Sequence, residues 1–303
     1  MKISEHHPFR SRKAKEQYLK LYDMRSKNWP VVSEAKMVDT SYGQTFVRIS
    51  GPVDASPVVL LPGAAANSLM WAPNIESLSE SYRTYAIDNI YDYGRSVYTR
   101  TPKNPNDLLT WLDEFFCALK LGGHIYLIGM SYGGWLASLY ALRFPTRLDK
   151  LVLLAPAATV LPLRLEFVMR LILTKIPQRY FTKSFINWLF KDAIQKDVAN
   201  RMTIDDIRIN DAFLTSRCFK PRHLFIPTVL KDKELQRLKV PTLFLVGENE
   251  KIYSARKSIQ RLNKVAPHIK TDIIPDAGHD LTFVQAGIVN RKILEFLKQP
   301  GAV

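Results

Sequence analysis

Short apolar runs that do not alternate with polar residues recur along this chain of 303 residues. Strands that are apolar throughout are buried on both faces, as in a parallel sheet covered by helices. Segments with helical spacing separate the runs, and this alternation predicts an α/β fold with a mostly parallel, doubly wound sheet. The expected strands are Val58–Leu61, Thr84–Ile87, Ile125–Gly129, Leu151–Leu154, Thr242–Val246 and Thr271–Ile274. The expected helices are Asn106–Leu121, Tyr132–Phe144, Ser254–Val265 and a last one from about Val284 to Leu297.

The N-terminal part of the chain precedes this pattern. Residues 11–27 have helical spacing, and two strands are expected after them, Ala35–Thr40 and Gln44–Ser50. A turn at Tyr42-Gly43 should join these two strands as a hairpin.

The strand–helix alternation is interrupted once, between Leu154 and Thr242. Helices are predicted there instead, at Leu161–Ile176, at Phe181–Lys191 and near Asp205–Ser216. Insertions occur where loops carry function, so a helical insertion between two strands should cover one edge of the sheet. We therefore expect one main domain, residues 1–156 and 241–303, and a helical cap, residues 157–240.

The pentapeptide at residues 129–133, Gly-Met-Ser-Tyr-Gly, lies between an expected strand and an expected helix. A sharp turn at such a junction lifts one side chain above the sheet edge, and the flanking glycines lack Cβ atoms that would clash in it. So short a pattern also occurs by chance, and the alternative interpretation is an ordinary glycine-rich turn. The strand–turn–helix context favours Ser131 as a nucleophile.

A serine hydroxyl needs a base to remove its proton, and the base needs a carboxylate that orients it. His279 follows the last expected strand, a context that the other histidines lack. With the acid placed between nucleophile and base in chain order, it should follow the strand Thr242–Val246. Glu250 is the favoured acid. Glu248, or an acid elsewhere such as Asp211, remains an alternative.

Two backbone N–H groups should face the negative charge that develops on an attacked carbonyl oxygen. Tyr132, directly after the nucleophile, is expected to supply one. The other should come from residues 62–66, Pro-Gly-Ala-Ala-Ala, which follow an expected strand. Ala64 is the candidate and Ala65 the second choice, while a simple turn is the plainer interpretation of this loop.

These motifs resemble the α/β-hydrolase superfamily across nearly the whole chain and, within it, the carboxylesterase NP (naproxen esterase-like) family. The residues that carry the closer resemblance are Trp29-Pro30, Asn67-Ser68, Trp71, Pro73-Asn74-Ile75, Tyr85-Ala86-Ile87-Asp88, Asp92, Ser96, Gly247-Glu248-Asn249-Glu250 and Tyr253. The resemblance implies the α/β-hydrolase fold, an esterase activity and a glutamate as the acid. One departure is Pro62-Gly63, where the superfamily commonly has His-Gly, and it leaves the position of the second oxyanion donor open.

The chain carries a formal net charge of +15, concentrated in residues 1–30 and 157–240. A positive surface attracts nucleic acid, anionic lipid or acidic substrates. Neither zinc-finger spacing nor an RNP-like motif is present, so no nucleic-acid partner is expected. A solvated basic surface is the plainest interpretation, and weak contact with anionic membrane surfaces is the second.

The two cysteines, Cys117 and Cys218, lie far apart without ligand spacing, and we expect reduced, mostly buried thiols. No metal or other cofactor is predicted. No apolar run is long enough for a membrane span, and the first residues lack the apolar core of a secretory signal, so a cytoplasmic location is expected.

The sequence therefore predicts a serine hydrolase that cleaves small carboxylic esters with apolar acyl or aryl groups through an acyl-enzyme. Thioesterases, lactonases and C–C hydrolases use the same three residue types. The alternative from another class is a non-catalytic ligand-binding protein on a hydrolase scaffold. The oligomeric state is not predicted.

The first expected cap helix has two rows of apolar residues. Together they provide more apolar surface than packing against a single neighbour would bury. One row is Leu165, Val168, Met169, Ile172 and Ile176, and the other is Leu163, Phe167 and Leu171. We expect one row to pack onto the main domain, with burial of Ile172, and the row with Phe167 and Leu171 to line the substrate pocket.

Overall fold

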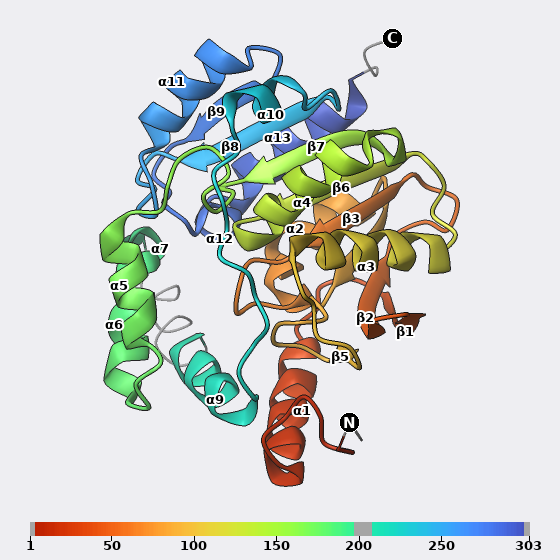
Figure 1. Ribbon diagram of the computed structural model, residues 1–303, viewed down its shortest axis with the longest axis vertical. Helices are drawn as coiled ribbons and strands as arrows, with labels where there is room; N and C mark the ends of the chain where they lie inside the picture. The colour runs from red at the N-terminus through yellow and green to blue at the C-terminus, as the bar shows by residue number, and fades with distance from the viewer. Residues whose placement is uncertain (1–3, 197–207, 300–303) are drawn as a thin grey trace.

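The apolar runs form the strands of one central sheet in the computed structural model, which describes residues 4–196 and 208–299 (Figure 1). The strands are β1 (Ser33–Thr40), β2 (Gly43–Ser50), β3 (Pro57–Leu61), β4 (Arg83–Ile87), β5 (Val97–Tyr98), β6 (Ile125–Met130), β7 (Leu148–Leu154), β8 (Thr242–Gly247) and β9 (Lys270–Ile274). Their order is β1-β2-β4-β3-β6-β7-β8-β9, with β5 paired to β2. Pairing is parallel from β4 to β9 and antiparallel among β1, β2, β4 and β5. The expected α/β fold with a mostly parallel sheet is confirmed.

Successive residues of each central strand enter two different apolar cores. In β3, Val58 and Leu60 belong to one core, and Val59 and Leu61 to the other. The side chains of α3 (Pro105–Ala118), α4 (Tyr132–Arg143) and α11 (Ala255–Val265) fill one core. Those of α2 (Ala72–Ser79), α12 (Leu281–Val284) and α13 (Ala286–Lys298) fill the other. Burial on both faces explains why these strands show no polar alternation.

The direction in which the chain adds parallel strands to the sheet changes at β3. From β3 it passes through α2 to β4, and then through α3 to β6 on the other side of β3. Ligands of open α/β sheets bind beyond the carboxyl ends of the strands where the winding direction changes. The loops after β3 and β6 meet at this place.

The helix α1 (Arg12–Ser26) begins at Ser11, whose side chain accepts the N–H of Ala14. Its Tyr18 and Tyr22 are buried in a third, smaller apolar cluster that also contains Phe219. The apolar pattern of the sequence does not reveal α2, α10 (Asp232–Gln236) or the two-residue strand β5. Each is too short for a periodic pattern to show.

Helices follow β7 where the strand pattern is interrupted: α5 (Leu165–Leu173), α6 (Arg179–Leu189), α7 (Lys191–Lys196) and α9 (Asn210–Cys218). They lie beside and below the sheet in the view of Figure 1. α5 is shorter than expected, because Pro162 precedes it and the chain turns at residues 174–178 before α6. Part of the third expected helix, residues 205–207, lies outside the described residues.

The expected packing of α5 is wrong. Leu165, Met169 and Ile172, which should have packed onto the main domain, are 75%, 52% and 50% exposed. Leu163 and Phe167 instead are partly buried against the larger core. The expectation of two buried thiols is also only half right, since Cys218 is buried and Cys117 is exposed.

Within the two described ranges, none of the helices combines the length and apolar character needed to cross a membrane.

Candidate active site

The turn between β6 and α4 holds Ser131 in a strained backbone conformation, with φ 52°. A Cβ atom on Gly129 would lie 2.3 Å from the carbonyl oxygen of Gly133. One on Gly133 would lie 2.4 Å from the carbonyl oxygen of Leu61 at the end of β3. Only glycine fits at either position, which explains the pattern around the serine in terms of close backbone approach.

Backbone hydrogen bonds to the neighbouring strand hold this turn in place. The Ser131 N–H donates to the carbonyl oxygen of Leu154 over 2.9 Å, and the Ser131 carbonyl accepts the N–H of Ala157 over 2.9 Å. These partners lie at and just beyond the end of β7. The serine side chain is therefore presented at the carboxyl edge of the sheet by a fixed backbone, and it retains partial solvent exposure.

Three side chains from three loops form one hydrogen-bonded chain at this edge. His279, in the loop after β9, has its Nε2 2.9 Å from Ser131 Oγ and its Nδ1 2.9 Å from Glu250 Oε2. Glu250, in the loop after β8, has a fully buried side chain, and His279 is 7% exposed. Exclusion of water strengthens the interaction between carboxylate and imidazole.

The second oxygen of the Glu250 carboxylate is also engaged. Oε1 accepts the N–H groups of Lys251 and Ile252 over 2.7 and 2.9 Å. The carboxylate is thereby fixed to its own loop with Oε2 directed at His279. A buried carboxylate with this set of partners can orient the imidazole and stabilise its protonated form.

The alternative acids lie elsewhere. Glu248 is exposed to solvent, and Asp211 forms an ion pair with Arg25 of α1 over 2.7 Å. Three of the other histidines are also engaged away from Ser131. His124 contacts Asp149, His268 contacts the carbonyl oxygen of Leu238, and His223 packs edge-on against Tyr98.

The loop after β3 lies against Ser131, since a Cβ atom on Gly63 would be 3.4 Å from Ser131 Cβ. Within this loop, Ala65 has φ 63° and donates its N–H to Asp92 Oδ2 over 2.8 Å. The N–H of Ala65 is therefore occupied. No partner within residues 4–196 and 208–299 accepts a hydrogen bond from the N–H of Ala64 or Tyr132.

Asp92 was noted in the sequence only as part of a family resemblance, and its structural role was missed. Its side chain is 1% exposed, and Oδ1 accepts a hydrogen bond from the guanidinium of Arg222 over 2.8 Å. Oδ1 also accepts the N–H of Tyr93. An acid in the loop after β4 was the available signal, but its partners Ala65 and Arg222 come from distant segments.

Helices α5 to α7 are hydrogen-bonded to the two loops that carry Glu250 and His279. Three of the bonds reach residues 249, 251 and 252, on either side of Glu250. The fourth reaches Asp280, next to His279. These bonds are Arg164 N–H to Ile252 O at 2.8 Å, Lys251 Nζ to Trp188 O at 2.8 Å, Asn249 Nδ2 to Asp192 Oδ1 at 3.0 Å, and Ala193 N–H to Asp280 Oδ2 at 3.0 Å. Burial raises the pKa of the Asp280 carboxyl.

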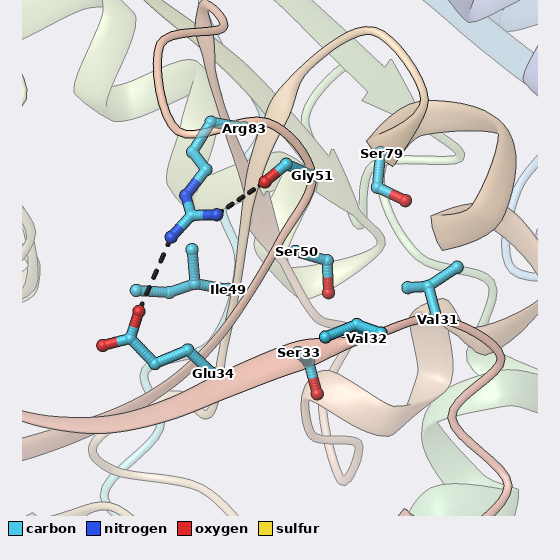
Figure 2. A pocket seen from close by; sticks show the side chains of 9 residues that line it. All are labelled: Val31, Val32, Ser33, Glu34, Ile49, Ser50, Gly51, Ser79 and Arg83. Atoms are coloured by element: carbon cyan, nitrogen blue, oxygen red, sulfur yellow. Dashed lines mark hydrogen bonds and ion pairs between the residues drawn. The ribbon is translucent and has the colours of Figure 1, made fainter.

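A surface pocket lies at the opposite edge of the sheet (Figure 2). It is lined by Val31, Val32, Ser33, Glu34, Ile49, Ser50, Gly51, Ser79 and Arg83. Arg83, the first residue of β4, donates to the carbonyl oxygen of Gly51 and pairs with Glu34 at 3.5 Å. The pocket lies at the amino end of β4, whereas Ser131 follows the carboxyl end of the parallel strand β6. The pocket is therefore separate from the three hydrogen-bonded side chains.

A serine in a strained turn after β6, with a histidine after the last strand and an acid after the preceding one, is the arrangement of an α/β hydrolase. Residues 56–286 match the α/β-hydrolase fold family, and the chain belongs to that family. The resemblance to the carboxylesterase NP family is also confirmed by the relatives that follow.

Two relatives come from Bacillus subtilis. An uncharacterized carboxylesterase, nap, is 33% identical over 280 residues, covering 92% of this chain and 91% of the relative. Carboxylesterase YbfK is 31% identical over 281 residues, covering 92% and 93%. The crystal structure of naproxen esterase (carboxylesterase NP) from Bacillus subtilis superposes with a TM-score of 0.85 at 29% identity, covering 98% of this chain and 100% of that one.

Proposed function

We propose that this chain is a carboxylesterase that hydrolyses small esters with apolar acyl or aryl groups through an acyl-enzyme. Ser131 is the nucleophile, His279 its base, and Glu250 the acid that orients the base. The observation that carries the proposal is the hydrogen-bonded chain from Ser131 Oγ through His279 to the buried Glu250. The relatives named carboxylesterase support the same reaction class.

In the first half of the reaction, Ser131 Oγ attacks the ester carbonyl carbon while its proton passes to His279 Nε2. The N–H groups of Ala64 and Tyr132 would stabilise the resulting oxyanion, since donors placed where charge develops lower the barrier. The C–O bond to the alcohol then breaks, and the alcohol leaves with the proton from His279.

In the second half, water attacks the acyl-serine carbonyl and gives a proton to His279. The tetrahedral intermediate collapses, the carboxylic acid leaves, and Ser131 recovers its proton. The Glu250 carboxylate stabilises the imidazolium that forms twice in each cycle. The cycle requires only the ester and water.

We further propose that residues 1–156 and 241–303 act as the catalytic domain and residues 157–240 as a cap that shapes the substrate pocket. Support comes from the hydrogen bonds between α5 to α7 and the loops of Glu250 and His279. Phe167 of α5 packs against Phe185 and Trp188 of α6, at ring-centroid distances of 5.9 and 6.5 Å. An apolar, aromatic cap favours apolar substrates.

Turnover of nitrophenyl esters of graded acyl length tests the proposal. We expect hydrolysis, with mass spectrometry of the quenched enzyme detecting one acyl group per chain. Matched thioester, lactone and C–C substrates, assayed in parallel, should be turned over less efficiently. Binding of esters without turnover would instead identify a ligand-binding protein on this scaffold, and higher efficiency on another bond type would reassign the reaction.

A further inference from the structure

Helix α5 exposes an unusual amount of apolar surface. None of its nine side chains is buried. Seven of the thirteen large apolar side chains that are exposed in the described residues lie between residues 165 and 180. They are Leu165, Met169, Leu171, Ile172, Leu173, Ile176 and Tyr180, here called the α5 ridge. Exposed apolar surface concentrated in one segment in this way indicates an interaction site.

The aromatic contacts between α5 and α6 involve Phe167, which is not part of this ridge. Phe167 fills the inner side of α5, against aromatic rings of α6. Arg170 lies on the same side, 5.1 Å from the ring centroid of Trp188, and pairs with Glu166 at 2.9 Å. Leu165, Met169 and Ile172, at spacings of four and three residues, form a separate outer face. Both helices lie at the margin of the molecule, away from the sheet (Figure 1).

Basic side chains surround the α5 ridge. Residues 164–183 contain five Lys or Arg and one acid, Glu166, which is already paired with Arg170. Arg164, Lys175 and Arg179 are exposed. Apolar side chains that emerge among cations match the boundary of an anionic bilayer, where acyl chains lie beneath negatively charged headgroups.

We propose that the α5 ridge docks this protein on the surface of anionic lipid bilayers. A second copy of the chain fits the same face less well. Pairing two ridges would bring two clusters of positive charge together, on molecules that each carry a net charge of +15. An anionic bilayer buries the same apolar side chains and neutralises the cations instead.

Docking at this ridge places the cap beside the lipid. Arg164 begins the basic border of the ridge, and its N–H is bonded to Ile252, two residues from Glu250. If the proposed function holds, esters that partition into the bilayer would be concentrated near the active site. The docking itself uses none of the three reacting side chains, so Ser131→Ala should bind vesicles as the parent does.

Co-sedimentation with lipid vesicles tests the proposal. We expect the protein to bind vesicles of equal parts phosphatidylglycerol and phosphatidylcholine, and to bind pure phosphatidylcholine far less. Raised salt should weaken binding. Replacing Leu165, Met169 and Ile172 together by serine should weaken it by about tenfold or more, since three apolar side chains no longer enter the interface. The matched control replaces Val53 and Ile226, exposed apolar residues outside the ridge, and should bind as the parent does.

The charge contribution is tested by Lys175→Gln with Arg179→Gln, for which we expect a loss of about fivefold per cation. Lys103→Gln with Lys264→Gln, exposed lysines elsewhere, is the control. Equal binding to both vesicle types, or unchanged binding of the triple-serine variant, would overturn the proposal. So would a parent dimer in sedimentation analysis that the triple-serine variant abolishes, because the ridge would then be a contact between copies.

Discussion

Asp92 accepts the N–H of Ala65 over 2.8 Å and so fixes the loop that lies against Ser131. Ala65 has a positive φ, which a residue other than glycine adopts at some cost. The bond from Asp92 supports that conformation, while the N–H of Ala64 has no acceptor among the residues that the structure describes. The ion pair of Asp92 with Arg222 connects the same loop to the segment that follows α9.

Asp92→Asn should therefore lower kcat by about tenfold to a hundredfold with little change in KM, since small displacements of catalytic groups have effects of that size. Arg222→Met should produce a weaker change in the same direction. Steady-state kinetics on a nitrophenyl ester, with thermal melts, would measure both. A rise in KM at unchanged kcat would show that Asp92 serves substrate binding instead of positioning the loop after β3.

Glu250→Gln should reduce kcat by about 10³- to 10⁴-fold, because the imidazole loses the carboxylate that orients it. Glu248→Gln is the matched control, two residues away and exposed, and should leave turnover nearly unchanged. Rates measured on the same ester decide the ranking. The reverse order would assign the acid to Glu248.

Gly133→Ala should destabilise the fold and lower activity, because its Cβ would lie 2.4 Å from the backbone oxygen of Leu61. Overpacking of this kind typically costs about 1–3 kcal/mol. Gly287→Ala is the control, since a Cβ there meets nothing within 4 Å, and it should have no effect or stabilise slightly. Denaturant titration of the two variants gives the comparison, and equal stability would contradict the close approach of α4 to β3.

Phe167→Ala should change the acyl-length or aryl preference and destabilise by about 1–2 kcal/mol, a common range for single substitutions. Ile172→Ala should alter stability by no more than about 0.5 kcal/mol, because Ile172 is on the solvent side. Substrate profiles and melts of both variants are the measurements. Unchanged selectivity in Phe167→Ala would make α5 a support of the cap with no part in the pocket.

Local patterns sufficed for the sheet. They also singled out Ser131, His279 and Glu250, which the structure joins by hydrogen bonds, because each follows a buried strand whose apolar run is visible in the sequence. These patterns did not predict which side of α5 faces the protein, because its two rows of residues are equally apolar in the sequence. Only the neighbouring α6 decides that Phe167 faces inward and Ile172 outward. The role of Asp92 was equally hidden, since Ala65 and Arg222 reach it from separate parts of the chain.

The central claim is that Ser131 is the nucleophile activated by His279. Labelling with a fluorophosphonate, followed by peptide mass spectrometry, tests it most directly, with turnover of Ser131→Ala measured in parallel. We expect the label on Ser131 alone and a loss of turnover on the order of a millionfold in the variant. A label on another serine, or a variant that retains as much as about a tenth of parental turnover where a nucleophile should be indispensable, would contradict the account.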